Sequence, residues 1–337
     1  MIRCEDWRNT SADALQALYR LERARWASRL HWDIDPTYRM LEDARTRGHA
    51  PGLIALDGAG RQVGWAYYGL ANRMLQIGGL VASSGEVTRA LLDGILRSTE
   101  ADMASDLMCF AFPASAALES ALARQRFAIT KYLYLSRELK AGSEPWRLRS
   151  AMRIAHWREM DAVMSVRLMA RAYAGVASAR VFAPRGTLEE WATYLAQLIK
   201  MPACGQFMPS ASLSATEQGN RPGEETLRGA LIATTLQTDT AHIAQIVVDP
   251  SLRRQGLARD LIETASAIAA AQGCSRITLL VSADNAPACA LYAAAGFKQT
   301  SHFVYATRQA PNRMRGTIRP ARMPASSPAG VTLSSRP

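Results

Sequence analysis

The residues that could do chemistry gather in a short basic segment, residues 253–258, which reads Arg-Arg-Gln-Gly-Leu-Ala. An apolar stretch before it ends at Asp249-Pro250, and a helix is predicted to begin near Leu257. Free backbone N–H groups at a helix N-terminus that follows a strand form a binding site for phosphate or pyrophosphate. Gly256 lets the backbone approach the anion, and the arginines add positive charge. The pattern Arg253-x-x-Gly256-x-Ala258 therefore predicts an anion loop, and the lack of a following Gly-Lys-Ser/Thr excludes a Walker loop.

The elements that must position this segment can be read from the spacing of the apolar residues. Residues 246–248 end an apolar strand, and residues 258–272 have helical spacing up to a stop at Gly273. We expect a strand over 276–281, a helix over 286–294 and a final strand over 302–306. Asn285, the pair Leu291-Tyr292 and the pair Gly296-Phe297 lie between the last two strands.

The order strand, anion loop, helix, strand, Asn…Leu-Tyr…Gly-Phe, strand resembles the second half of a domain of the GNAT superfamily of N-acetyltransferases. The resemblance covers residues 227–307 well and residues 151–226 loosely. It implies that the strand that ends at residues 246–248 pairs through its backbone with the pantetheine arm of CoA. It also implies that the loop of residues 253–258 holds the pyrophosphate. The implied cofactor-binding residues are Ile246, Val247, Val248, Arg253, Arg254, Gln255, Gly256, Leu257, Ala258, Asn285 and Tyr292.

Two of these residues also have implied roles near the thioester. Tyr292 stands where many members of the family place a tyrosine that protonates the departing thiolate. A phenol with a pKa of ~10 stays protonated at neutral pH, whereas a thiol near ~8.5 needs its proton back. A purely structural tyrosine is the alternative. Asn285 matches an asparagine near the thioester, but it could equally cap the helix over 286–294, or do both.

A general base for the acceptor amine is not evident in the sequence. An amine of pKa ~10.4 is neutral in only about one molecule in 2,500 at pH 7, so its deprotonation costs ~4.6 kcal/mol. The strand over 241–248 contains no carboxylate, and His242 as a base and Gln245 as a holder of water are the candidates there. A surface histidine is the alternative for His242. Glu189 and Glu190 are further candidates, and an α-amine acceptor would reduce the need for a base.

Composition limits the class of protein. The chain has 337 residues, which predicts two domains, and 48% hydrophobic residues allow large cores. The start of the chain has no secretion-signal pattern, no apolar run could span a membrane, and the five cysteines form no C-x-x-C pair. These features predict a cytoplasmic protein with reduced thiols and no metal. Six arginines and no acidic residue lie in 308–337, so much of the net charge of +11 is local. We expect a disordered tail there and no role in binding membranes or nucleic acid.

The first half of the chain resembles a degenerate copy of the second. Arg3-x-x-x-Trp7-Arg8 recurs 150 residues later, and residues 122–135 align with 292–305 at an offset of 170. In that alignment Phe127 pairs with Phe297, but Ser115 and Leu122 stand at the positions of Asn285 and Tyr292, and the anion-loop pattern is missing. The layout resembles mycothiol synthase-like proteins, in which one half is catalytic.

We therefore predict a mixed α/β (α+β) protein of two GNAT-like domains in tandem, each a mixed, mostly antiparallel sheet flanked by helices. The predicted boundaries are 1–140 for the degenerate domain, 141–150 for a linker, 151–307 for the catalytic domain and 308–337 for the tail. An insertion over about 175–225 includes a helix over 187–200 that is opened by a capping box.

The predicted function is transfer of an acetyl group from acetyl-CoA directly to a primary amine of a small molecule or a peptide. One alternative is a non-catalytic acyl-CoA sensor, and another is a nucleic-acid-associated protein that acts through the arginine tail. The sequence leaves the acceptor, the acyl chain length and the oligomeric state open.

Overall fold

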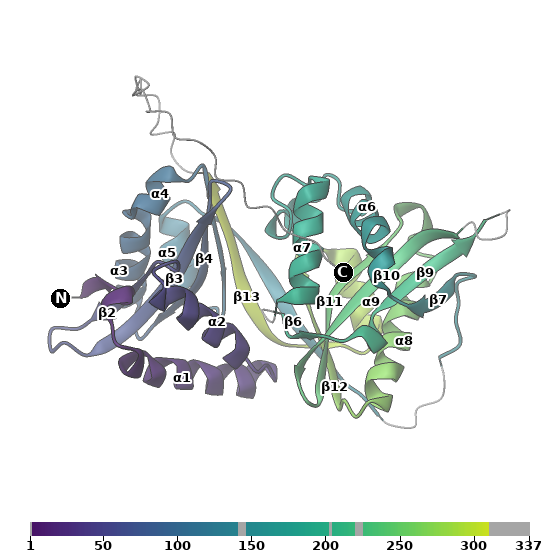
Figure 1. Ribbon diagram of the computed structural model, residues 1–337, viewed down its shortest axis with the longest axis horizontal. Helices are drawn as coiled ribbons and strands as arrows, with labels where there is room; N and C mark the ends of the chain where they lie inside the picture. The colour runs from purple at the N-terminus through teal and green to yellow at the C-terminus, as the bar shows by residue number, and fades with distance from the viewer. Residues whose placement is uncertain (1, 141–145, 202–203, 220–224, 310–337) are drawn as a thin grey trace, which may run out of the picture.

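Two halves with the same order of elements make up the structure, a computed structural model that describes residues 2–140, 146–201, 204–219 and 225–309 (Figure 1). The first half contains β1 (Arg3–Asp6), η1 (Trp7–Asn9), α1 (Ala12–Leu30), α2 (Asp35–Thr46), β2 (Gly52–Leu56), β3 (Gln62–Ala71), β4 (Met74–Ala82), α3 (Gly85–Leu96), α4 (Thr99–Met103), β5 (Asp106–Ala111), α5 (Ala116–Arg124) and β6 (Ala128–Glu138).

The second half repeats this succession of main strands and helices, with β8 and three short 3-10 helices added and, among the described residues, without a counterpart of α4. It contains β7 (Arg153–His156), η2 (Glu159–Asp161), α6 (Ala162–Ala172), η3 (Ala177–Val181), α7 (Leu188–Lys200), β8 (Gln206–Phe207), η4 (Pro209–Ala211), β9 (Leu213–Gln218), β10 (Glu225–Gln237), β11 (Thr240–Val248), η5 (Pro250–Leu252), α8 (Leu257–Ala271), β12 (Arg276–Ser282), α9 (Ala286–Ala294) and β13 (Lys298–Gln309). The predicted mixed α/β class and the duplicated layout are confirmed.

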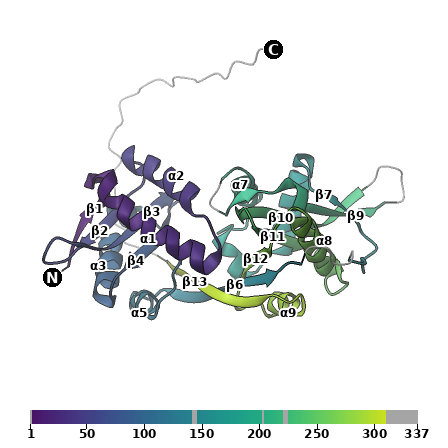
Figure 2. The ribbon, with the colours of Figure 1, turned by 90° about the horizontal axis from the view of Figure 1, so that it is seen from below.

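All strands belong to one 13-stranded sheet, in the order β1-β2-β3-β4-β5-β13-β6-β12-β11-β10-β9-β7, with β8 added beside β10. The pairs β4–β5 and β11–β12 are parallel, and the other pairs are antiparallel. The last strand of each half is therefore exchanged. β13 lies between β5 and β6, and β6 lies between β12 and β13, so the two halves form a continuous sheet (Figures 1 and 2).

Each exchanged strand carries an arginine that contacts the other half of the molecule, and the two arginines make equivalent contacts. Arg137 on β6 donates a hydrogen bond to the Ala295 carbonyl (2.7 Å), and its guanidinium lies 5.1 Å from the centre of the Phe297 ring. Arg308 on β13 does the same in the first half, with the Gln125 carbonyl (2.8 Å) and the Phe127 ring (4.9 Å). Figure 2 shows α5 and α9, which precede these contacts, at the two ends of the β6–β13 pair.

Helices cover both faces of the sheet in each half, so that each half has three layers. In the first half α3 and α5 cover one face through a core that contains Leu91, Leu92 and Leu122. Helices α1 and α2 cover the other face, where the rings of Tyr19 and Tyr38 meet Trp65 edge-on. In the second half α8 and α9 pack on one face through residues such as Leu261 and Ala265, and α6 and α7 pack on the other.

Most of the predicted elements are found within two or three residues of their expected bounds, with one notable exception at the end of the chain. β13 continues through Gln309, so Arg308 belongs to the sheet, although it was predicted to begin the tail. Residues 310–337 of the predicted tail and 141–145 of the predicted linker lie outside the described residues. The domain boundaries remain a prediction, since β6 and β13 each pair with the opposite half.

Helix α7 has the predicted cap, but only half of the capping box. The Thr187 hydroxyl accepts a hydrogen bond from the Glu190 N–H (3.2 Å). The Glu190 carboxylate does not reach back to residue 187 and instead accepts bonds from the backbone and the guanidinium of Arg185.

Candidate active site

Strands β11 and β12 pair at one end and separate at the other. Their parallel register runs from Thr240–Arg276 to Ile243–Leu279, and no described residue of β12 pairs with residues 244–248. A register shift against β10 places a bulge at Ala244, where the separation begins. On the side that faces β12, the backbone edge of residues 244–248 is thus left without a strand partner in the described part of the chain. An extended ligand can pair with such an edge.

The separated end of β11 leads directly into the predicted anion loop. Arg254 and Gly256 have positive φ angles of 65° and 90°, and Gly256 caps α8 without a side chain. The first bond of the helix runs from the Asp260 N–H to the Gly256 carbonyl (3.0 Å). Among the described residues, the backbone N–H groups of residues 254–259 have no acceptor. These N–H groups at the positive end of the helix dipole fit a pyrophosphate.

A buried carboxylate fixes the strand-to-loop junction. One oxygen of Asp249 accepts bonds from the N–H and hydroxyl of Ser251, and the other pairs with Arg171 (2.6 Å) and Arg228 (3.1 Å). Burial would raise the pKa of this carboxyl, but the bonds from Ser251 and the two arginines outweigh it and lower the pKa to about 2. Asp249 therefore pairs with two arginines outside the loop and with neither Arg253 nor Arg254.

Those loop cations differ in how they are held. The Arg253 guanidinium donates to the Ala172 carbonyl at the end of α6 (2.9 Å), which fixes it beside the loop. Arg254 is exposed and has no carboxylate partner in the described part of the chain. The loop thus combines unpaired N–H groups, one fixed cation and one free cation, which suits a polyanion.

Comparison with known proteins agrees with this geometry. Residues 176–297 match the family model of the acetyltransferase (GNAT) family, and this range contains the separated strands, the loop and α9. The second half of the chain carries a GNAT acetyltransferase domain.

Solved structures extend the likeness in fold to both halves. The GCN5-related N-acetyltransferase of Sphaerobacter thermophilus is 14% identical, with 77% of this chain and 80% of that chain covered and a TM-score of 0.58. A tandem GNAT protein from the clavulanic acid biosynthesis pathway is 15% identical over 78% and 83%, with a TM-score of 0.50. The glucosamine N-acetyltransferase region of a fungal multi-domain β-N-acetylglucosaminidase is 13% identical over 91% and 38%, with a TM-score of 0.62. A comparison with curated proteins found no match.

Tyr292 of the GNAT domain lies in the core beside the separated strands. It is 6% exposed, and its ring meets the edge of Phe297. Burial raises the pKa of its hydroxyl, with smaller contributions from Tyr173 and Cys289. The hydroxyl has no hydrogen-bond partner among the described residues and keeps its proton at neutral pH. The retained proton is what the predicted proton donor needs, whereas the raised pKa makes transfer of that proton less favourable. The role of Tyr292 as a proton donor stays a prediction.

Asn285 caps helix α9. Its side-chain oxygen accepts a hydrogen bond from the Ala288 N–H (3.2 Å), and Pro287 occupies the first turn. The capping role is thus present in the structure. The side-chain amide nitrogen is not used by the cap, so the predicted role at the cofactor stays open as a second use of the same residue.

The structure places His242 inside the protein, which argues against its predicted role as a base. Its ring is 3% exposed and packs against Trp32 and Tyr134 of the first half. Nδ1 lies 2.9 Å from the Thr278 hydroxyl. Burial lowers the pKa of the imidazole to about 3, so the ring is neutral at physiological pH and a poor proton acceptor. The alternative of a surface histidine is wrong, because the ring is buried, and the role of His242 as a base stays a prediction.

Gln245 is held by two tyrosines that we did not predict. Its amide nitrogen donates to the Tyr173 hydroxyl (2.7 Å), and its oxygen accepts from the Tyr194 hydroxyl (3.1 Å). Tyr173 in turn donates to the Ile246 carbonyl on the separated strand (2.9 Å). With both ends of its amide engaged, Gln245 positions β11, and its role as a holder of water stays a prediction.

The remaining candidate bases lie at the outer end of α7. Glu190 is paired with Arg185 (2.9 Å), and Glu189 is exposed in the first turn. Trp191 and Tyr194 of the same helix face the core, where they are 1% and 9% exposed. Burial raises the pKa of Glu190, but its bonds to Arg185 more than offset this and lower it.

The first half also reaches this region through its exchanged strand. Tyr132 on β6 pairs in register with Ser282 at the end of β12. Burial raises the pKa of its hydroxyl, and Tyr305, Tyr173 and Asp284 add to the shift. No local sequence signal could identify Tyr132, because its position depends on the pairing of strands far apart in the chain.

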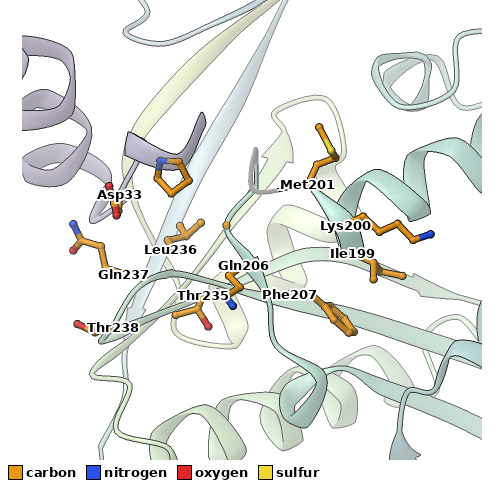
Figure 3. Close-up of a pocket in the computed structure, with 12 residues that line it drawn as sticks. Asp33, Ile199, Lys200, Met201, Gln206, Phe207, Thr235, Leu236, Gln237 and Thr238 are labelled. Carbon is orange, nitrogen blue, oxygen red and sulfur yellow. The ribbon is translucent and has the colours of Figure 1, made fainter. Parts of the chain in front are cut away.

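A hollow of about 390 Å³ lies between the halves at the β10–β11 hairpin (Figure 3). Asp33 of the first half lines one side, with Gln237 next to it, and Lys200 and Phe207 line the other. The hairpin is at the opposite end of β11 from the anion loop, so the hollow is separate from the predicted cofactor site. In the described part of the chain we find no cluster of His, Cys, Asp and Glu that could hold a metal, and no helix that could cross a membrane.

Proposed function

We propose that the protein is an acyl-CoA-dependent N-acetyltransferase that transfers an acetyl group directly to a primary amine of a small molecule or a peptide. The observation that carries the proposal is the continuity of three features. Strand β11 separates from β12 at the Ala244 bulge, its edge without a strand partner leads to the unpaired N–H groups of residues 254–259, and Tyr292 belongs to the core against which Ile246 and Val248 pack.

The chain's own residues would act by binding and orienting. The loop N–H groups with Arg253 and Arg254 hold the pyrophosphate, and the free edge of residues 244–248 pairs with the pantetheine arm. Bound acetyl-CoA supplies a thioester whose acetyl carbon the amine attacks, with the C–S bond breaking and the sulfur leaving as a thiolate. Tyr292 gives its hydroxyl proton to that sulfur, and backbone N–H groups at the bulge stabilise the negative charge on the carbonyl oxygen. The proton that the attacking amine loses passes to water, and the Tyr292 phenolate takes a proton back from water, so that an amide and a thiol are the products.

The acceptor side is built of phenols and an amide. Tyr173, Tyr194 and Gln245 form a connected polar wall behind residues 245 and 246. A wall of this kind orients an amine but removes its proton poorly. The proposal therefore favours an acceptor with a low amine pKa, such as an α-amine, which is neutral more often at pH 7 than a lysine side chain.

A non-catalytic acyl-CoA sensor is the second candidate, and the burial of His242 favours it. Turnover separates the two. We would titrate acetyl-CoA calorimetrically and then follow thiol release with a panel of amines. One cofactor site per chain together with thiol release supports the transferase. Binding without release from any amine supports the sensor, and no binding overturns both.

Replacement of Tyr292 by phenylalanine tests the proton donor. We expect kcat to fall by about 100-fold, because general acid catalysis contributes about that much, while the affinity for acetyl-CoA stays the same. Tyr68→Phe, which removes a buried hydroxyl from the first half, serves as the matched control and should leave kcat unchanged. An unaltered kcat in Tyr292→Phe would remove this residue from the mechanism.

A further inference from the structure

The segment that joins the two halves is fastened to the helix that begins at the anion loop. Asp260, in the first turn of α8, is fully buried. Its carboxylate accepts hydrogen bonds from the Trp146 indole (2.8 Å), from the N–H groups of Arg149 (3.0 Å) and Ser150 (2.8 Å), and from the Ser150 hydroxyl (2.7 Å). Every one of these donors lies in residues 146–150, which we call the junction segment.

The bonds make Asp260 a stable anion. Burial alone would raise the pKa of this carboxyl, but the bonds from Ser150 and Trp146, together with the two backbone N–H groups, outweigh burial and lower the pKa. A buried carboxylate that is satisfied by four donors fixes the position of the backbone that carries them. The junction segment is thereby held in one place against α8.

This fastening brings Arg149 against the loop glycine. A Cβ atom built on Gly256 would lie 3.1 Å from the Arg149 Cβ and 3.8 Å from its Cδ. The aliphatic part of Arg149 therefore covers the side of Gly256, next to the unpaired N–H groups. The guanidinium stacks over the Trp146 ring (5.1 Å), on which Arg259 also stacks (5.4 Å).

The charges at this place do not balance within the described residues. Arg259 pairs with Glu263 (2.7 Å), whereas Arg149 and Arg254 are exposed and have no carboxylate partner in the described part of the chain. Arg149 and Arg254 therefore bring two uncompensated positive charges beside the loop, and an anion bound there would compensate them. The free cation of the junction segment thus stands at the rim of a site that already suits phosphate.

We propose that Arg149 is a cofactor-binding residue that contacts a phosphate group of CoA, and that Asp260 is the residue that positions it. The inference rests on the proposed binding of acyl-CoA at residues 253–258 and extends that site to a residue outside the GNAT domain match. The junction between the halves is then part of the cofactor site, and the bound cofactor ties the first half to the second.

Calorimetric titrations of CoA and of 3′-dephospho-CoA into the full-length protein test the proposal. Arg149→Ala should weaken CoA binding about tenfold, since a charge-assisted hydrogen bond to phosphate is lost, and Arg149→Glu should weaken it further. Arg147→Ala, an exposed arginine two residues away, is the matched control and should bind as the wild type does. A loss with CoA alone assigns Arg149 to the 3′-phosphate, and an equal loss with both ligands assigns it to the pyrophosphate.

Asp260→Ala tests the positioning role. It should weaken CoA binding by a factor similar to that of Arg149→Ala, and the double variant should be no weaker than either single one, because both changes remove the same contact. Ser150→Ala, which removes one donor, provides a milder change if Asp260→Ala melts below the assay temperature. Wild-type binding of CoA with unchanged affinity in both Arg149 variants would overturn this inference and leave the proposed function standing. A wild-type protein that binds no CoA would overturn the proposed function itself.

Discussion

The two halves of the molecule share a frame but differ at the few positions that could make a cofactor site. In the first half β4 pairs with β5 only from Met74 to Ile77, and a register shift against β3 places a bulge at Gly78. These features match the bulge at Ala244 and the separation of β11 from β12. A separated pair of strands is therefore a property of the fold and does not by itself indicate cofactor binding.

The two halves differ in the side chains at the start of the helix that follows the separated strand and at the bulge. In the first half the Ser84 hydroxyl caps α3 by accepting from the Val87 N–H (3.3 Å), and Glu86 adds a negative charge to the first turn. In the second half Gly256 leaves the equivalent N–H groups free. The Tyr67 ring also lies directly against Gly78 and Gly79, where an added Cβ would be 2.3 Å and 2.6 Å from it. The first half has thus kept the scaffold while its own side chains occupy both ends of the site.

The largest expected effect on acetyl-CoA binding comes from placing a glutamate side chain at the start of α8, compared with the same change at the start of α3. Gly256→Glu should reduce acetyl-CoA binding by more than about 100-fold, because it adds a negative charge and a side chain where the anion approaches. Gly85→Glu makes the same change near the start of α3, where an added Cβ meets nothing closer than 3.7 Å, and should leave binding unchanged. Calorimetry with both variants, after a check of their melting temperatures, decides whether one half alone binds the cofactor.

Arg137 and Arg308, the arginines on the two exchanged strands, should contribute different amounts to the free energy of unfolding. Arg137 also bonds to Glu263 (2.9 Å) and to Ser266, whereas Arg308 bonds only to the Gln125 carbonyl among the described residues. We expect Arg137→Ala to lower the free energy of unfolding by about 3 kcal/mol and Arg308→Ala by about 1 kcal/mol. Urea unfolding measures both, and equal losses would show that the extra partners of Arg137 contribute nothing.

The pH dependence of stability should reflect His242, whose counterpart on β4 is Gln76. The pKa of His242 is about 3 in the folded protein, and a free histidine has a pKa of ~6.5. The unfolded chain therefore takes up the proton first, and the stabilisation that is complete above pH ~6.5 is lost as the pH falls toward 3. Between pH 6 and 5 the wild type should lose up to about 1.4 kcal/mol more per pH unit than His242→Gln. If urea unfolding gave the same pH dependence for the wild type and for His242→Gln, the His242 ring would have to be solvated in the folded protein.

The smallest expected effect on stability comes from the Ser84 side chain, which caps α3 in the first half. Ser84→Ala removes the acceptor of the Val87 N–H, so the free energy of unfolding should fall by about 1 kcal/mol. The same variant should gain no second acetyl-CoA site, because Glu86 and Tyr67 still oppose a ligand there. A stoichiometry of two sites per chain would show instead that the cap alone had closed the first half.

Local signals in the sequence predicted the part of the fold that surrounds the cofactor loop. Gly273 ended α8, and Asn285 with Pro287 opened α9, within a residue of the expected places. The anion loop itself was identified from Gly256 and its arginines, because its chemistry depends on neighbours in the chain. The predicted alignment of Phe127 with Phe297 agrees with the structure, in which the N–H groups of these residues donate to the carbonyls of Leu122 and Tyr292 in the same way.

Features that depend on distant segments could not be predicted in this way. The environment of His242 is made by Trp32 and Tyr134, which lie more than 100 residues earlier in the chain. One partner of Gln245 directly follows α6 and the other lies on α7, and Arg308 joins the sheet only because β13 crosses into the first half. Apolar periodicity gives the face of a strand but not its partner, so the exchange of β6 and β13 left no trace in the pattern of either half.

The exchange of strands has a consequence for how the chain can be synthesised. When β6 leaves the ribosome, the strand that separates it from β5 is still about 160 residues away, since β13 begins at Lys298. During that interval β5 and β6 each present an open edge, and open edges are the places where nascent chains pair with wrong partners. Neither half can therefore complete its part of the described sheet until β13 has been translated, so the last step of sheet assembly depends on a strand that the two halves share.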